Sequence, residues 1–214
     1  MAQPLLQILR RPPAVPLETC EFCGAAMAAE HGHLVDLPRR VILCVCRPCY
    51  LLFTHDGAGG ARFRAIPQRY ALVPEFAAAD EQWNTLDLPI GLAFFFRNSL
   101  TGRTTAFYPS PAGATESELP LDAWDSLVSA APLLATMADD VEAFLIRRQL
   151  PSPQAGTTAR AGVDALVVPI DVCYELVGRI RRGWRGIQGG DDLWHDIDEF
   201  FEHVTRRADA ERTR

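Results

Sequence analysis

The chain has 214 residues, 48% of them apolar, with a formal net charge of −6 and a pI of about 5.4. This length can form one medium-sized domain, or a small module and a larger domain, around a hydrophobic core of its own. The acidic balance argues against general nucleic-acid binding, which needs a basic surface. All 21 cationic residues are arginine, which excludes chemistry that uses a lysine Schiff base or a P-loop lysine.

Residues 1–17 are rich in proline, and we interpret them as an extended N-terminal arm. No apolar run in the sequence approaches the roughly 20 residues that are needed to span a bilayer. Arg10 and Arg11 follow a short apolar stretch, whereas a secretory or twin-arginine signal places its charges before a longer one. We therefore expect a cytoplasmic protein without a membrane span, in which reduced cysteines serve as metal ligands or core residues.

Residues 18–55 hold five of the six cysteines and form a predicted metal-binding module. Cys20 and Cys23 make one Cys-x-x-Cys pair, and Cys46 and Cys49 make a second pair after an interval of 22 residues. Such a pair in a tight turn directs two sulfurs to the same side, and a second pair brought over by a hairpin completes a tetrahedral site. The spacing therefore predicts one metal ion bound by these four cysteines.

Two strands, at 31–37 and 40–46, are predicted between the pairs, joined by a proline-containing turn. Either a two-residue or a four-residue turn places His33 opposite Cys44 and His31 opposite Cys46, and side-chain alternation puts all four on one face of the hairpin. Each histidine is open to three interpretations. It replaces a cysteine ligand, it donates a hydrogen bond to a cysteine sulfur from the second shell, or it lies on a solvated face. Cys44 is interpreted as a second-shell thiol, with a ligand role as the alternative.

The order of these elements is typical of a treble-clef zinc module: a Cys-x-x-Cys turn, a hairpin, and a second pair at a helix start. Pro48 suits the first turn of a helix that contains Cys49. Four thiolates close a zinc site, and a closed site is structural. Iron bound as in rubredoxin is the alternative, although rubredoxin uses two similar turns. We therefore expect zinc, with iron as the alternative cofactor.

The larger domain is predicted over residues 61–207, after a glycine-rich break in the chain. Its pattern indicates a mixed α/β domain with a β-hairpin core and C-terminal helices, so the whole chain is expected to have an α+β fold. The predicted strands are 61–66, 90–97, 104–108 and 165–168. The predicted helices are 121–129, 140–149, a helix from an N-cap at Asp171 towards Trp184, and a helix capped by Asp191.

The larger domain offers few candidates for catalysis. The stretch Ser110–Ser117 is dense in small and hydroxyl residues, but it has neither a G-x-S-x-G elbow nor a glycine-rich phosphate pattern. We interpret it as a loop between a strand and a helix. His195 and Glu199 are spaced as charged neighbours on a surface helix. Cys173 falls on the apolar face of a helix and is expected in the core. No catalytic or cofactor-binding residues are assigned.

Three long stretches of the chain resemble a single uncharacterised bacterial family. They are CEFCGAAMAAEHGHLVDLPRRVILCVCRPCYLLF, PIGLAFFFRNSLTGRTTAFYPSPAGATESELPLDAW and VVPIDVCYELVGRIRRGWRGIQGGDDLWHDIDEFF. The resemblance covers about residues 18–204. Members of that family are encoded beside the genes of actinobacterial-type, high-affinity [NiFe] hydrogenases. The resemblance implies a part in making or supporting that hydrogenase, and it carries no established catalytic residues.

Three functional hypotheses fit these observations. The first is a non-enzymatic accessory protein, in which zinc fixes the module and the protein binds the [NiFe] hydrogenase or its maturation factors. The second is a rubredoxin-like iron protein that passes electrons to the hydrogenase. The third is an enzyme that uses the Ser110–Ser117 loop. We favour the first, because the predicted metal site is closed and the sequence holds no constellation of catalytic residues.

Overall fold

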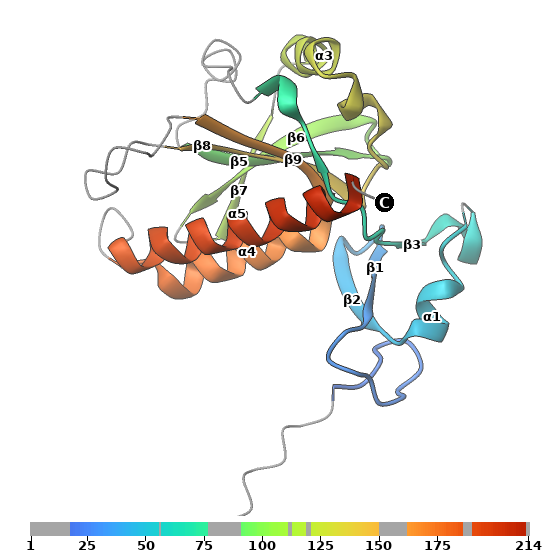
Figure 1. Ribbon diagram of the computed structural model, residues 1–214. Coiled ribbons are helices and arrows are strands. Elements are labelled where there is room, and N and C mark those ends of the chain that lie inside the picture. Colours follow the sequence, from blue (N-terminus) through green and yellow to red (C-terminus); the bar gives the residue numbers. More distant parts are fainter. Residues whose placement is uncertain are drawn as a thin grey trace, which may run out of the picture.

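A computed structural model of the chain describes residues 18–55, 57–76, 91–110, 113–118, 121–149, 162–185 and 190–212. The predicted N-terminal arm lies outside these residues. The described chain has a mixed α+β fold with two antiparallel sheets and four α-helices. A small N-terminal module and a larger body are distinct in the ribbon, and the C-terminal helix ends near their junction (Figure 1). The α+β prediction is therefore confirmed.

The small sheet forms the centre of the N-terminal module, which we define as the described residues between 18 and 66. Its strand order is β2-β1-β3, with bounds Val41–Val45, Gly32–Asp36 and Phe63–Ala65. The pairing of His33 with Cys44 and of Asp36 with Val41 is as predicted, with the four-residue turn. Because β3 pairs with β1, this sheet includes residues that the sequence assigns to the larger domain.

The large sheet has six strands in the order β4-β9-β8-β5-β6-β7, and every neighbouring pair is antiparallel. The bounds in that order are Ala71–Leu72, Gly162–Pro169, Glu142–Gln149, Leu92–Asn98, Arg103–Ser110 and Gly113–Glu118. The predicted hairpin of β5 and β6 is present, and Asn98 pairs with Arg103 across its turn. The predicted strand at 165–168 is also present as part of β9.

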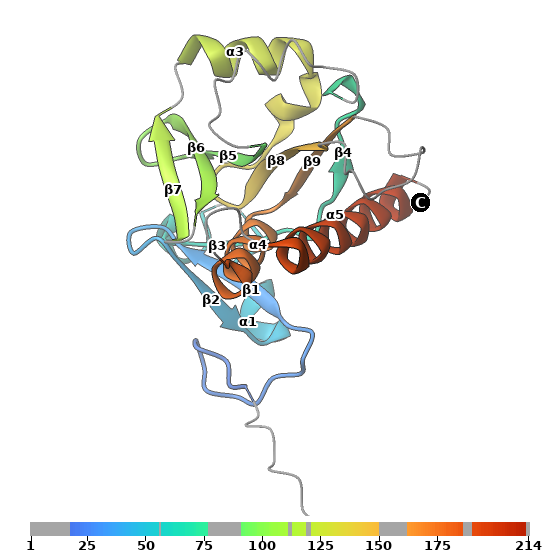
Figure 2. The ribbon, with the colours of Figure 1, turned by 90° about the vertical axis from the view of Figure 1, so that its left-hand side faces the viewer.

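Helices cover both faces of the large sheet (Figure 2). One face packs against α4 and α5, while α3 lies on the other. The α-helices are α1 (Arg47–Leu51), α3 (Leu121–Ala130), α4 (Ile170–Gly183) and α5 (Asp191–Arg212), and the short 3₁₀ helices are η2 (Ala58–Ala61), η3 (Pro74–Phe76) and η4 (Pro132–Thr136). Among the described residues, none of these helices combines the length and the apolar character that crossing a bilayer demands.

The helix predicted over 140–149 is wrong, because this segment is the central strand β8. The Phe144 side chain lies on the face of the sheet that α3 covers, whereas the Leu145 side chain lies on the face that α4 and α5 cover. Both side chains are fully buried. A strand that is buried on both faces has a continuous apolar run, and periodicity alone cannot distinguish such a run from a buried helix.

Two further sequence predictions are corrected by the fold. The stretch Ser110–Ser117 was expected to be a loop, but Ser110 ends β6 and pairs with Gly113 at the start of β7. Helix α4 begins at Ile170 with Pro169 in the N-cap position, so Asp171 lies in the first turn and is not the cap. The fixed φ of proline matches the backbone at this strand-to-helix junction.

The module packs into one of the hydrophobic clusters of the larger domain. Val35 and Leu37 from the module pack in the same cluster as Ile170 and Leu176 of α4. Polar contacts support this packing. The Arg64 guanidinium of β3 donates to a carboxylate oxygen of Asp140 at 3.1 Å, and Asp140 lies two residues before the start of β8. The module is therefore fixed against the larger domain by both apolar and charged contacts.

We expect Phe144→Ala to reduce the free energy of unfolding by about 3–5 kcal/mol, because it removes a fully buried aromatic ring from the central strand. Urea unfolding followed by circular dichroism measures this change. Leu100→Ala is the control, because Leu100 is 63% exposed in the β5–β6 turn and should change stability by less than about 0.5 kcal/mol. Equal effects of the two substitutions would contradict the position of β8.

Candidate metal centre

The first Cys-x-x-Cys pair lies in a tight turn at the start of the module. The Gly24 N–H donates to the Cys20 carbonyl at 2.8 Å, and Thr19 and Ala26 form an isolated β-bridge that closes the turn. Gly24 has a φ of 74°, in the left-handed region that a side chain disfavours. The turn therefore brings Cys20 and Cys23 to the same side of the chain.

The second pair lies at the start of α1. Cys46 occupies the N-cap position, Pro48 is in the first turn, and Cys49 follows inside the helix. The helix packs closely on β1, since a Cβ at Gly32 would lie 2.6 Å from the Tyr50 ring. This close packing fixes the position of the helix start, and with it the position of both sulfurs, relative to the hairpin.

The four cysteines Cys20, Cys23, Cys46 and Cys49 come together, with all sulfurs within 4.8 Å of one another. The Cys23 and Cys46 sulfurs lie 3.7 Å apart. A tetrahedral site with metal–sulfur bonds of about 2.3 Å has sulfur–sulfur edges of about 3.8 Å. Cys20 and Cys49 are buried, while Cys23 lies at the surface. The arrangement can bind one metal ion through four sulfurs.

The two buried thiols, Cys20 and Cys49, differ in how easily they ionise. Burial raises the pKa of Cys20, but hydrogen bonds from the backbone at Cys46, Cys23 and Phe22 outweigh it and lower this pKa to about 6. Burial and hydrogen bonds with the other thiols raise the pKa of Cys49 to about 12. The Cys20 thiolate therefore forms easily, whereas Cys49 would gain its charge when a cation binds and displaces its proton.

His31, His33 and Cys44 form a group of their own beside the four cysteines. One ligand atom from each residue lies within 4.8 Å of the other two. The two imidazole rings meet edge to face, with centroids 4.9 Å apart. The predicted sharing of one hairpin face is therefore confirmed for these three side chains, whereas the Cys46 sulfur belongs to the other group. None of them belongs to the group of four sulfurs.

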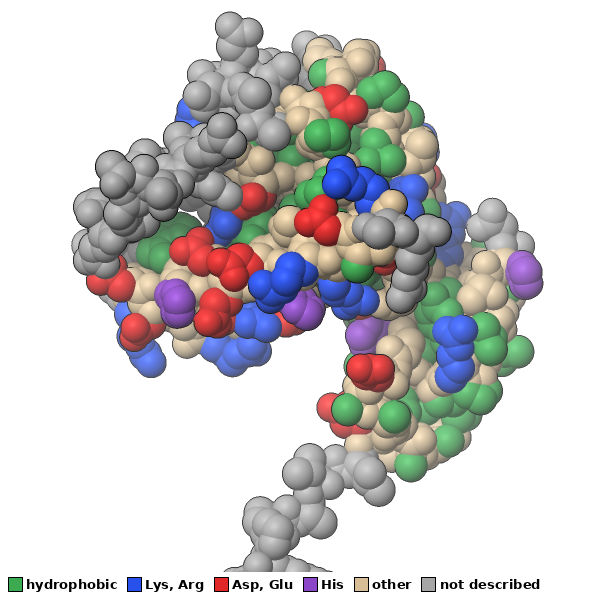
Figure 3. Space-filling view, in the orientation of Figure 1, with side chains coloured by type: hydrophobic (Ala, Val, Ile, Leu, Met, Phe, Trp, Pro, Cys, Tyr) green, Lys and Arg blue, Asp and Glu red, His purple; other side chains and the backbone are tan. Residues whose placement is uncertain are grey.

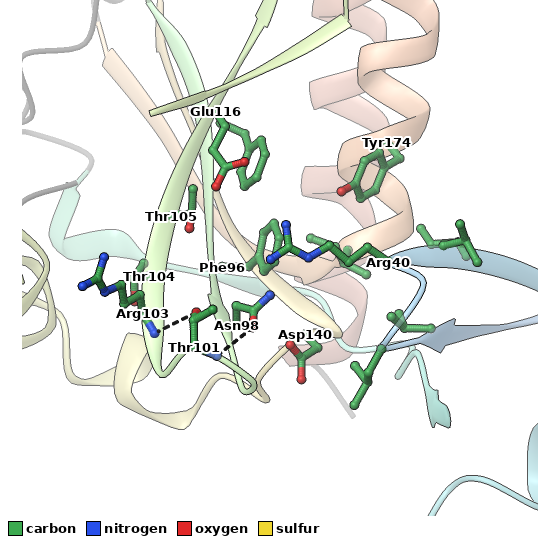
Figure 4. A pocket seen from close by; sticks show the side chains of 16 residues that line it. Arg40, Phe96, Asn98, Thr101, Arg103, Thr104, Thr105, Glu116, Asp140 and Tyr174 are labelled. Atoms are coloured by element: carbon green, nitrogen blue, oxygen red, sulfur yellow. Dashed lines mark hydrogen bonds between the residues drawn. The ribbon is translucent and has the colours of Figure 1, made fainter. Parts of the chain in front are cut away.

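A cavity of about 890 Å³ lies between the module and the larger domain. Arg40 projects into it from the β1–β2 turn, Tyr174 faces it from α4, and Glu116 faces it from β7 (Figure 4). Arg40 and Asp140 line this cavity and have positive φ values of 53° and 67°. Strained backbone of this kind concentrates at ligand-binding positions. Because both units supply its walls, the cavity exists only when the module is docked.

The remaining sequence candidates lie apart from these groups. Ser110 accepts a hydrogen bond from Thr115 across the β6–β7 hairpin. His195 is on the exposed face of α5, with its Nε2 atom 3.4 Å from Glu199. Cys173 is fully buried in the core, as predicted. The sequence interpretation missed Asp171 as a partner of the module, and no local pattern could have revealed a contact with a residue 138 positions away.

We expect Cys20→Ser to abolish metal binding at the four-cysteine centre and to destabilise the module, because metal-binding and folding free energies are linked. Cys173→Ser is the control, since this buried cysteine lies in the main core and should leave the metal in place. Metal content and thermal unfolding of both variants measure the difference. Retention of the metal by Cys20→Ser at wild-type affinity would contradict this ligand set.

Of the comparisons with known proteins, only the one with family models finds a match. No curated protein and no solved structure matches the chain. A family model that is described as a family of unknown function matches residues 19–208, which include the module, both sheets and the C-terminal helices. The match covers most of the chain, and the protein therefore belongs to this family, DUF5947.

Proposed function

We propose that this chain is a cytoplasmic, zinc-binding accessory protein that binds a protein partner and does not turn over a substrate. Four thiolates complete the coordination of a zinc ion and leave no position for a substrate. A turn, a hairpin and a ligand pair at a helix start follow one another in the module. This order supports a treble-clef zinc module, because rubredoxin binds iron with two similar turns.

Exposed apolar side chains on the module are the observation that carries the proposal. Leu52 is 63% exposed, Leu51 is 49% exposed and Phe22 is 43% exposed. They are half of the six large hydrophobic residues that are exposed in the described chain, although the module is its smaller part. Hydrophobic side chains gather on the outer surface of the module (Figure 3). An exposed apolar surface of this kind is typical of protein–protein interfaces.

The metal centre and this surface are linked through α1. Leu51 is the last residue of α1, Leu52 is its C-cap, and Cys49 lies two residues before Leu51. Phe22 lies between the two cysteines of the first pair, and its ring packs on that of Phe53 at 5.2 Å. A zinc ion at the four sulfurs would therefore hold the apolar side chains in position for a partner.

The nature of the partner follows from the resemblance to a family encoded beside [NiFe]-hydrogenase genes. In this proposal the partner is the hydrogenase or one of its maturation factors. Gene neighbourhood is an association and not a mechanism, so the proposal depends on a direct binding experiment. The acidic character of the chain supports a protein partner over a nucleic acid.

We expect protein purified under native conditions to contain zinc and to be colourless, because zinc has a filled d shell. Elemental analysis with an absorption spectrum makes this measurement. A red-brown sample with iron near one equivalent per chain would contradict the zinc proposal and support the rubredoxin-like alternative.

We expect Leu52→Glu to prevent capture of the hydrogenase or its maturation factors by the tagged protein from hydrogen-grown cells. The substitution places a charge within the apolar surface and leaves the four sulfurs unchanged. Leu100→Glu is a matched control, because Leu100 is the same residue type with the same 63% exposure on the larger domain. Both variants should retain wild-type metal content.

A deletion strain tests the same proposal in the cell. We expect reduced hydrogenase activity without this protein, restored by the wild-type gene and not by the Leu52→Glu variant. Normal hydrogenase activity in the deletion strain, together with no hydrogenase-related protein in the capture experiment, would disprove the proposed role.

A further inference from the structure

We infer that His31, His33 and Cys44 form a second metal site, separate from the four-cysteine centre, which takes one divalent transition-metal ion of borderline softness. One ligand atom from each residue lies within 4.8 Å of the other two. Two imidazoles and one thiolate suit ions such as Zn²⁺, Co²⁺ and Ni²⁺ and disfavour Mg²⁺ and Ca²⁺, which prefer oxygen. The inference does not depend on the identity of the protein partner.

The hydrogen bonds of His31 leave one ring nitrogen ready for a metal. Its Nδ1 atom lies 3.1 Å from the Ala29 carbonyl oxygen and 3.3 Å from that of Ala28. A carbonyl only accepts, so Nδ1 carries a proton, and the tautomer with its single proton on Nδ1 has a lone pair on Nε2. The Nε2 atom is buried, and it has no hydrogen-bond partner among the described residues. A buried acceptor of this kind is costly unless another group satisfies it.

His33 is oriented in the way that metal-binding histidines usually are. Its Nδ1 atom lies 2.5 Å from the Asp171 Oδ2 atom, and the other Asp171 oxygen accepts the Val172 N–H at 2.9 Å. A histidine that binds a metal through one nitrogen commonly donates its other N–H to a carboxylate, which fixes the ring and makes the ligand more basic. The pair of Asp171 and His33 therefore leaves Nε2 as the nitrogen for the metal.

Cys44 is fixed opposite His33 by the hairpin register and by the first cysteine turn. The Cys44 N–H donates to the Glu21 carboxylate at 2.6 Å, and the Cys44 carbonyl accepts the Glu21 N–H at 3.0 Å. Glu18, Glu21 and Asp171 also place negative charge around the Cys44 thiol. Three carboxylates around this group of ligand atoms favour a bound cation.

Three protein ligands leave one coordination position open. A closed set of four sulfurs holds a structural ion, whereas three ligands with a free position admit water or a donor atom of another molecule. The site also joins the two parts of the chain, because His33 is in β1 and Asp171 is in α4. Metal binding at this site would therefore reinforce the docking of the module on the larger domain.

The number of cobalt ions bound by the full chain tests this inference. Metal-free reduced protein is titrated with Co²⁺, and the bound metal is measured after desalting together with the thiolate-to-cobalt absorption. We expect two equivalents in the wild type, and one equivalent in Cys44→Ser and in His33→Asn. Retention of the first ion in these variants also shows that the module is folded. His195→Asn is the control, because this histidine is 77% exposed on α5, and it should bind two.

The Asp171→Asn variant tests whether Asp171 orients the His33 ring without itself binding the metal. We expect it to bind two ions, with the affinity for the second reduced on the order of 10- to 100-fold. A single wild-type equivalent that requires Cys20 would overturn the inference, as would two equivalents in both Cys44→Ser and His33→Asn. One equivalent that survives Cys20→Ser and disappears in Cys44→Ser would support this site and contradict the four-cysteine centre, so the two metal proposals fail separately.

Discussion

Four cysteine sulfurs within 4.8 Å of one another are the constraint on which the N-terminal module depends. The hydrophobic core of the module is small and includes two of these cysteines, Cys20 and Cys49. A core of this size stabilises a fold poorly without a metal or a disulfide. Burial also raises the pKa of the Cys49 thiol, and the nearby charge of Cys20 adds to this effect. A metal bound by the four sulfurs would remove both difficulties, because it would compensate the negative charge and link the first turn to α1.

The module completes a cavity at the surface of the larger domain. The six-stranded sheet and its helices have cores on both faces, and the module adds a wall beyond α4 that encloses a cavity of about 890 Å³. Contacts through Val35 and Leu37, and the polar pairs of Arg64 and His33, hold this wall in one orientation. The cavity is therefore lined by residues of both units, and neither unit alone supplies all of its walls.

Features that depend on neighbouring residues can be predicted from the sequence, whereas features that depend on contacts between distant elements cannot. Alternation of side chains along two short strands was enough to place His33 opposite Cys44. Strand β8 was mistaken for a helix because its burial on both faces depends on α3, α4 and α5, which the segment itself cannot specify. The contact of Asp171 with His33 is missed for the same reason, since this partner lies in another unit, 138 positions away. The treble-clef geometry and the metal's identity depend on coordination that spacing alone does not determine.

The two edges of the large sheet affect how this protein can associate. At one edge β4 has only two residues, which is too short to pair stably with another strand. At the other edge β7 is longer and carries the exposed Glu116. Antiparallel pairing with the same strand of a second copy can bring the two Glu116 carboxylates together, and like charges on facing strands repel. Within the described part of the chain, the sheet edges therefore disfavour extension from copy to copy, whereas the β7 edge would tolerate an added strand with basic side chains.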